Sequence, residues 1–477
     1  MNSDLAQVID PIVRLVWLAG ASAFVLGLMR MNSPATARNG NLLSAAGMTL
    51  AVAATALWLL VIPPSGTFNV TGWIVILLGI AAGGGYGLYS ARTVKMTAMP
   101  QLVSLFNAVG GGAAALIAIA EYLHHTEAPN LQDNVSTVLD VIIGAITFSG
   151  SLIASGKLMG LKITPAKPVM IPGGQLVTIA LAVVTVVASF YLFLGNYSIA
   201  ILGVVLVVAL VFGITMTLPI GGADMPVVIS LLNSFTGTAV AMAGFVLNNP
   251  VLIIAGALVG ASGAILTKLM ADAMNRSVMN IMVGGFGGGD SAGGAAVGGP
   301  GGSVREVSMD DAAIQLAYAQ HVIVVPGYGL AVAQAQHAVR ELAELLEDKG
   351  VDVKYAIHPV AGRMPGHMNV LLAEANVPYP QLKEMEEINP EFDRCDVALV
   401  IGANDVTNPA ARRPGSPVSG MPILDVDHAK SIIVMKRSMG KGYAGIDNEL
   451  YVNTKTGMLF ADAKAGLAEL ISAVKAV

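Results

Sequence analysis

The sequence predicts a polytopic α-helical membrane domain of about nine spans, followed by a soluble α/β domain with a Rossmann-like, doubly wound parallel sheet. Of the 477 residues, 55% are hydrophobic and only 12% are charged, about half the roughly 25% of an ordinary soluble protein. The charges are unevenly distributed, because residues 1–303 contain 10 Lys/Arg and 9 Asp/Glu whereas residues 304–477 contain 16 and 22. This composition excludes disordered and wholly soluble proteins.

Composition also limits the partners and sites to be expected. The single cysteine, Cys395, excludes a disulfide framework and a Cys-rich metal site, and no metal site is expected. The net charge of −5 argues against a nucleic-acid partner. The long apolar segments instead require a lipid membrane.

The distribution of charged residues and glycines divides the chain into three regions. Residues 1–283 form the expected membrane domain and residues 304–477 the expected soluble domain. Between them, residues 284–303 contain 11 glycines. Such a stretch buries too few side chains to order itself, so a flexible tether is expected.

Nine apolar segments are long enough to cross about 30 Å of hydrocarbon, which takes roughly 20 helical residues. The first segment has Asp4 and Asp10 at its start and no basic residue before it. It is therefore interpreted as a retained helix rather than a signal peptide. The segments lie near residues 7–29, 42–62, 70–90, 100–123, 135–157, 174–194, 197–218, 226–247 and 250–271.

Basic residues alternate between the loops of the predicted membrane domain. Lys or Arg follows spans 1, 3, 5 and 9, as at Arg30, Arg92 and Lys157, and is absent after spans 2, 4, 6 and 8. Basic loops remain on the cytoplasmic side. The sequence therefore predicts an N-terminus outside and a soluble domain in the cytoplasm.

Two asparagines lie inside predicted spans, Asn107 in the fourth and Asn233 in the eighth. Either could form only an interhelical hydrogen bond, but together, in a glycine-rich bundle, they favour a hydrated path. Asp224 lies at the cytoplasmic edge of span 8. Glu121 and Asp140 are placed near outer ends of spans, so this chain lacks an obvious titrating group for a proton path.

The soluble region alternates predicted helices and strands, which indicates a doubly wound parallel sheet. A helix at 308–320, capped by Ser308, precedes a continuous apolar strand at 321–325, a pattern typical of strands buried on both faces. The other expected elements are a helix at about 330–348, strands at 351–357, 396–401 and 431–435, and a final helix at about 462–475.

The turn after the first strand has the form GxGxx(V), from Gly327 to Val332. Glycines in this position allow the backbone to approach a pyrophosphate, although such a turn can also serve only to pack helix on strand. The second strand ends in His358-Pro359 instead of the acid that holds the ribose of NAD. His358 is interpreted as structural rather than as an acid–base group.

Polar clusters follow three strands and are expected to meet in one crevice at their carboxyl ends. The cations near Lys436 and Arg437 could clamp an additional phosphate, which favours NADP(H) over NAD(H), or could form only a solvated basic turn. Asp405 could bond to the cofactor or cap the next turn. Hydride transfer itself requires no catalytic acid or base. The clusters are residues 358–367, 402–408 and 436–443.

At these motifs the sequence resembles the beta subunits of proton-translocating NAD(P) transhydrogenases, over nearly the whole chain. The resemblance implies that the domain from about residue 305 binds NADP(H) and that NAD(H) binds a separate alpha subunit. Hydride would pass directly between the two nicotinamides, coupled to inward proton movement. The stretches that carry the resemblance are residues 221–234, 273–277, 326–336, 357–374, 401–405 and 436–439.

The resemblance also implies partners and a location. Alpha subunits would supply the NAD(H) domain and further membrane helices, and two alpha–beta units are expected to form a dimer. The expected location is the bacterial cytoplasmic (inner) membrane.

By motif, the resemblance assigns Gly327, Tyr328 and Gly329 to the pyrophosphate region and Lys436 and Arg437 to the 2′-phosphate. The cofactor would lie in a reversed orientation across the sheet, which would account for the missing acid after the second strand. The rest of the expected cofactor site consists of Val332, Arg363, Met364, Pro365, Asn404, Asp405, Ser438 and Tyr443.

The expected residues of the proton path and its coupling are Asn107, Asp224, Asn233 and Arg276. Some members of the resembled family have a histidine at the position of Asn107 that is central to proton translocation. Either the path here uses water and Asn107, or a titrating histidine lies on a helix of the partner subunit. The second explanation is favoured, because a pKa near neutrality suits reversible proton transfer.

A channel or transporter with a regulatory nucleotide-sensing domain is the alternative interpretation. It would have the same nine spans and the same nucleotide fold but would transfer no hydride. The chain contains one dinucleotide motif, so a transhydrogenase chain of this kind is expected to be active only with the alpha subunit.

Overall fold

The computed structural model describes residues 2–31, 33–61, 69–124, 130–165, 168–169, 173–221, 224–284, 303–364, 366–416, 418–442 and 444–477. The chain divides into two compact units. One consists of Met1–Pro219 and Val228–Ile265, and the other of Ile220–Val227 and Leu266–Val477. Most of the expected tether, residues 285–302, lies outside the described residues.

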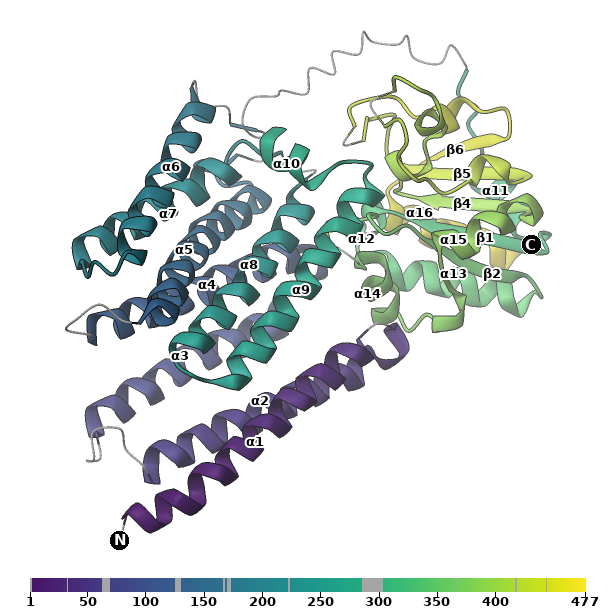
Figure 1. Ribbon diagram of the computed structural model, residues 1–477. Helices are drawn as coiled ribbons and strands as arrows, with labels where there is room; N and C mark the ends of the chain where they lie inside the picture. Colours follow the sequence, from purple (N-terminus) through teal and green to yellow (C-terminus); the bar gives the residue numbers. More distant parts are fainter. Residues whose placement is uncertain are drawn as a thin grey trace. The chain divides into compact units, whose positions relative to one another are not determined.

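The predicted membrane spans are confirmed: nine helices of the described residues are long and apolar enough to cross a membrane (Figure 1). A short helix, α10 (Val278–Gly284), follows the last of them. The nine are α1 (Asn2–Arg30), α2 (Pro34–Val61), α3 (Val70–Thr93), α4 (Met99–His124), α5 (Leu131–Met159), α6 (Gly174–Phe193), α7 (Ile199–Thr217), α8 (Met225–Val246) and α9 (Pro250–Ala273).

Small residues allow some of these helices to pack closely, as GxxxG-type interfaces do. A Cβ on Gly144 of α5 would lie 2.5 Å from the carbonyl oxygen of Gly111 in α4. A Cβ on Gly237 of α8 would lie 2.4 Å from the backbone nitrogen of Gly260 in α9. Five glycines of α3 differ, because a Cβ on Gly79, Gly83, Gly84, Gly85 or Gly87 would meet no described atom within 4 Å.

The soluble domain contains a six-stranded parallel sheet in the order β3-β2-β1-β4-β5-β6. This is the strand order of the Rossmann-type doubly wound folds, so the predicted fold class is confirmed. The strands are β1 (His321–Pro326), β2 (Asp352–Ile357), β3 (Leu382–Glu384), β4 (Val397–Ile401), β5 (Ser431–Lys436) and β6 (Thr456–Phe460).

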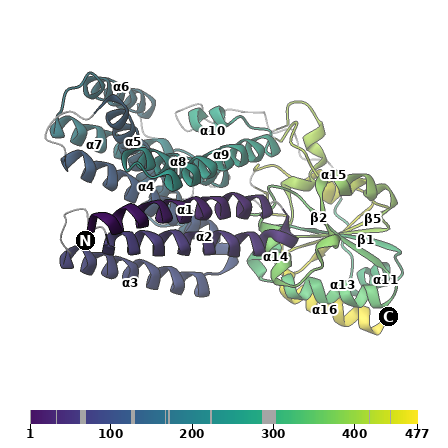
Figure 2. The same cartoon turned by 60° about the horizontal axis from the view of Figure 1, so that its bottom comes forward.

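Helices cover both faces of the sheet. Figure 2 shows α11, α13 and α16 together on one side of the strands and α15 on the other. The helices of this domain are α11 (Met309–Ala317), α12 (Tyr328–Ala333), α13 (Gln336–Asp348), α14 (His367–Glu374), α15 (Met385–Ile388) and α16 (Ala463–Ala476), with a 3-10 helix η3 (Asn389–Arg394) after α15.

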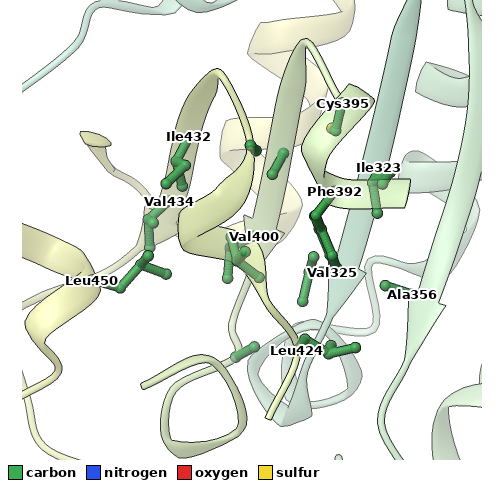
Figure 3. Close-up of a cluster of buried hydrophobic side chains, with 14 of the residues drawn as sticks. Ile323, Val325, Ala356, Phe392, Cys395, Val400, Leu424, Ile432, Val434 and Leu450 are labelled. Atoms are coloured by element: carbon green, nitrogen blue, oxygen red, sulfur yellow. The ribbon is translucent and has the colours of Figure 1, made fainter. Parts of the chain in front are cut away.

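The central strands are apolar because they are buried on both faces, as parallel strands of such sheets are. On one face, Phe392 and Cys395 lie over Ile323 and Val325 of β1, and Val400 continues the cluster on β4 (Figure 3). The whole cluster comes from residues of the soluble domain. Residues 304–477 therefore contain a complete hydrophobic core.

The structure differs from the sequence prediction in two respects. The single helix expected at 330–348 is divided into α12 and α13, because Gln334 has a left-handed backbone with φ of 52°. Strands β3 and β6 were not expected. β3 has only three residues, and β6 has only three consecutive apolar residues, 458–460, which follow Gly457.

Candidate functional site

A cavity of about 380 Å³ lies at the carboxyl ends of the strands. The chain leaves β1 toward β2 on one side and continues from β4 to β5 on the other. Ligands of open α/β sheets bind at such a switch point. The lining residues are Gly329, Val332, Ala333, Gly402, Ala403, Asn404, Met435, Lys436, Arg437, Ser438, Gly440, Lys441, Ala461, Asp462 and Ala463.

The glycine turn after β1 packs directly on the backbone after β4. The amide of Gly327 donates to the carbonyl oxygen of Ile401 at 2.9 Å, and the amide of Gly329 donates to that of Gly402 at 3.0 Å. A Cβ on Gly327 would lie 2.4 Å from backbone atoms of Ala403. Gly327 and Gly329 thus allow the turn to pack against the backbone after β4, which is the packing role that the sequence left open. Gly329 and Val332 also line the cavity.

Cations gather on the loop after β5, at the rim of the cavity. Arg437 and Lys441 are exposed. The ammonium of Lys436 lies 4.6 Å from the centre of the Tyr451 ring, and it donates to the carbonyl oxygen of Gly440 at 2.5 Å. Burial lowers the pKa of Lys436, although Asp405 and Asp447 attract the charged form. The cavity is therefore positively charged on one wall.

The loop after β4 supplies polar atoms to the same place. The side-chain oxygen of Asn404 is buried and has no hydrogen-bond partner among the described residues, so it remains available to a ligand. Asp405 accepts a hydrogen bond from the amide of Ala444 at 3.0 Å. Asp405 therefore ties the loop after β4 to the loop after β5.

A second group of predicted residues lies beside the glycine turn rather than in the cavity lining. The guanidinium of Arg363 stacks on the ring of Tyr328, 4.6 Å from its centre. The buried His367 lies with its ring centre 6.3 Å from that of Tyr328. Met364 is next to Arg363 on the β2–α14 loop. The predicted residues Pro365 and Tyr443 lie outside the described residues.

His358 occupies the position where an acid was missing from the sequence pattern. Its Nε2 lies 2.9 Å from the carbonyl oxygen of Pro422, and its Nδ1 accepts from the amide of Val360 at 3.2 Å. Burial lowers the pKa of His358 to about 4, although the bond to Pro422 acts in the other direction. The neutral ring with its proton on Nε2 satisfies both partners, so this histidine is structural, as expected.

The membrane asparagines lie on packed helices. Asn107 is buried in α4, where its amide group donates to the carbonyl oxygen of Ile229 in α8 at 3.3 Å. The backbone carbonyl oxygen of Asn107 accepts from the hydroxyl of Thr236 in α8 at 3.3 Å. Asn233 is half-buried on α8, one turn beyond Ile229. The structure thus places both asparagines on helices of one interface, and it gives Asn107 the interhelical hydrogen bond that the sequence left open.

Asp224 and Arg276 form an ion pair. The guanidinium Nη1 lies 2.9 Å from the carboxylate Oδ2, with 15% of the Asp224 side chain and 42% of the Arg276 side chain exposed. Sequence reasoning named both residues separately, and the structure shows that they act on each other.

Sequence reasoning missed some residues of these sites. The cavity wall formed by Ala461, Asp462 and Ala463 follows β6, which was not recognised as a strand. Asp462 caps α16 by accepting from the amides of Lys464 and Ala465, and a cap directly after an apolar run was the available signal.

Comparisons with known proteins agree over nearly the whole chain. The sequence model of the family described as NAD(P) transhydrogenase beta subunit matches residues 13–473. Two curated relatives named NAD(P) transhydrogenase subunit beta, both from Rhodospirillum rubrum and one of them from a particular strain, are similar to this chain. Each is 48% identical over 468 residues, which cover 96% of this chain and 98% of the relative.

Proposed function

Because the chain belongs to the NAD(P) transhydrogenase beta subunit family, we propose that its soluble domain binds NADP(H) and that its membrane domain couples hydride transfer to inward proton movement. Family membership makes the chain a subunit of an oxidoreductase that uses nicotinamide nucleotides and has an alpha subunit as partner. The nine membrane helices make it a multi-pass membrane protein. Because of this family membership, we do not propose the alternative, a nucleotide-sensing transporter.

The residues of the crevice fit NADP(H). The observation that carries this proposal is the positive wall of the cavity, formed by Lys436, Arg437 and Lys441, because a 2′-phosphate requires cations that NAD(H) does not. Ser438 adds a hydroxyl on the same wall. The unpartnered, buried side-chain oxygen of Asn404, a residue of the cavity lining, offers an acceptor.

The other predicted residues complete the proposed site. Gly329 and Val332 face the cavity from the first turn, with Gly327 holding that turn against β4. Arg363, stacked on Tyr328, supplies a further cation near the turn. Asp405 holds the loops together, and Met364, Pro365 and Tyr443 belong to the same proposed site.

Bound NADP(H) supplies the nicotinamide that accepts or donates the hydride. The chain's own residues bind and orient it and hold the loops over it. No acid or base is assigned among them, since hydride transfer moves no proton to or from the protein. NAD(H) is assigned to the alpha subunit, since the chain has a single dinucleotide crevice in its described residues.

For the membrane domain, we assign proton conduction to Asn107 and Asn233 and its link to the soluble domain to Asp224 and Arg276. Coupling requires that proton binding change the relative affinities for NADP⁺ and NADPH, because a ligand with equal affinity for both states shifts nothing. A titrating histidine on an alpha-subunit helix is part of this proposal. So are a dimer of alpha–beta units and a bacterial inner membrane with the N-terminus outside.

The cofactor assignment is tested by calorimetric binding of NADPH and NADH to the fragment 304–477, which contains the complete core. Lys436→Ala and Arg437→Ala are compared with Lys430→Ala, whose lysine pairs with Asp396 at the opposite end of the sheet. We expect NADPH preference in the parent and in Lys430→Ala. Each crevice variant should lose about 1.5–3 kcal/mol, roughly 10- to 150-fold in affinity. Equal binding of both nucleotides would contradict the assignment.

A further inference from the structure

One face of α5 is polar along its whole length. The face contacts α4: the hydroxyl of Ser155 donates to the carbonyl oxygen of Gln101 at 3.1 Å, and the hydroxyl of Ser104 donates to that of Ser151 at 2.8 Å. Positions three, four and seven residues apart share a helix face. The face therefore consists of Asp133, Ser136, Thr137, Asp140, Gly144, Thr147, Ser151 and Ser155.

Asp140 lies in this face and is fully buried, with 0% of its surface exposed. It is the tenth residue of α5, about 14 Å along the helix at 1.5 Å per residue. Neither of its carboxylate oxygens has a hydrogen-bond partner among the described residues. The sequence suggested a position near the outer end of a span, but the structure encloses this carboxyl group inside the bundle.

The surroundings of Asp140 contain few groups that titrate. The helices packed on α5 include α4, α6 and α7, and α8 also contacts it, as at Leu232 beside Gly150. Among their residues and those of α5 itself, the charged or titratable side chains are Asp133, Lys157, Glu121, Tyr122, His124 and Tyr191. Within the described structure, none of these forms a hydrogen bond or an ion pair with Asp140. An ionised carboxylate in such a place is costly, so Asp140 requires a proton.

Three neighbouring polar side chains differ from Asp140, because each of them already has a hydrogen-bond partner. The hydroxyl of Thr147 donates to the carbonyl oxygen of Ile143 at 2.6 Å, and Ser104 and Asn107 also have partners. A Cβ on Gly111, one turn beyond Asn107, would lie 2.8 Å from Thr147. The polar face thus leads from Asp140 past Thr147 to the level of Asn107.

We propose that Asp140 is a proton-binding residue of the transport path in this chain. The carboxylate takes up a proton that arrives along the Asp133, Ser136 and Thr137 side of α5, and the carboxylic acid releases it toward Thr147 and Asn107. Only a proton is gained and lost, and no electron is transferred. This inference rests on the proposed proton translocation.

The test uses the complete alpha–beta enzyme in vesicles with a trapped pH-sensitive dye, and records proton movement, coupled hydride transfer and NADPH binding. Asp140→Asn is compared with Asp140→Glu and with Asp10→Asn. The last makes the same change at a membrane-helix carboxylate that is paired with Arg14. We expect Asp140→Asn to lower both coupled rates about 100-fold, as loss of a proton-transfer group does, with NADPH binding unchanged. Asp140→Glu should restore much of the rate, with a shifted pH profile, and Asp10→Asn should behave as wild type.

Proton movement at the wild-type rate in Asp140→Asn would overturn the assignment of Asp140. Absence of proton movement in the wild-type enzyme would instead refute the proposed function itself. If Asp140→Asn fails to assemble, the wild-type enzyme is treated with a lipid-soluble carbodiimide, which modifies protonated carboxyl groups. Modification of Asp140 with parallel loss of proton movement would support the proposal, and an unmodified Asp140 in mass spectrometry would overturn it.

Discussion

Substituting Gly402 with alanine tests the contact that forms the crevice. Gly402 follows β4, has a left-handed backbone with φ of 67°, and accepts from the amide of Gly329 through its carbonyl oxygen. A Cβ at this position would lie 2.4 Å from the Cα of Gly329 and 2.7 Å from the backbone nitrogen of Leu330. Both are backbone atoms, so no side-chain rotation can relieve the contact.

The cost has two parts. A left-handed alanine costs about 1–2 kcal/mol, and overpacking costs about 1–3 kcal/mol, which gives about 2–5 kcal/mol in all. A whole domain has a free energy of unfolding of only about 5–15 kcal/mol. Gly350→Ala is the matched control, because φ is 88° there but a Cβ would meet no described atom within 4 Å. Its cost should be about 1–2 kcal/mol.

The assay is urea unfolding of the fragment 304–477, followed by circular dichroism, with calorimetric NADPH binding at a urea concentration where all variants are folded. Gly402→Ala should lower the unfolding midpoint more than Gly350→Ala without a change in the slope m. It should also weaken NADPH binding, since the glycine turn and the β4 loop must separate. Equal midpoints for the two variants would refute the reasoning, because backbone strain alone would then explain both.

Three further predictions concern single contacts. His358 should lower the free energy of unfolding of the fragment by about 2 kcal/mol between pH 7 and pH 5. Burial lowers the pKa of His358 in the folded state to about 4, whereas its pKa in the unfolded chain is about 6.5. As the pH falls, the unfolded chain therefore takes up the proton first, which favours unfolding. Urea titrations at both pH values should show that this share of the loss is absent in His358→Gln. Asp405→Ala removes the acceptor of the Ala444 amide and should speed NADPH dissociation about ten-fold or more, whereas an unchanged stopped-flow rate would show that this bond does not hold the loop. The ion pair between Asp224 and Arg276 can be tested by a double-mutant cycle with Asp224→Asn and Arg276→Gln, measured on the coupled rate. The cycle should give an interaction energy of about 0.2–1 kcal/mol for this partly exposed pair. Additive effects of the two substitutions would show that the residues act independently.

Much of the soluble fold could be predicted because its signals are local. The strands β1, β4 and β5 are continuous apolar runs, and each is followed by glycine or charge. Strand β3 has no such signal, since three half-exposed residues at a sheet edge are selected by pairing with β2 and not by their own composition. The break at Gln334 was hidden for a related reason. Glutamine forms helices well, so its identity gives no signal of the left-handed backbone that Gln334 adopts.

The crevice could be located from the sequence because strands of a parallel sheet bring their carboxyl ends to one edge. This argument placed Lys436, Arg437 and Asn404 together, and the structure confirms that they line one cavity. It did not show that Arg363 would stack on Tyr328, beside the residues that line the cavity. Order along the chain gives the edge of the sheet on which a side chain lies, but the rotamer decides what it contacts.

Two buried titratable groups show why burial alone does not identify a proton-binding residue. His358 and Asp140 are both enclosed, and in the sequence both lie near the end of an apolar segment. The neutral ring of His358 already uses both nitrogens, so a second proton would break the bond from Val360. Asp140 has no bond to lose, and uptake of a proton removes an unpaired charge from a buried site. Proton binding therefore destabilises the first site and stabilises the second, which is why the proton path is assigned to the carboxyl group and the histidine to the architecture of the crevice.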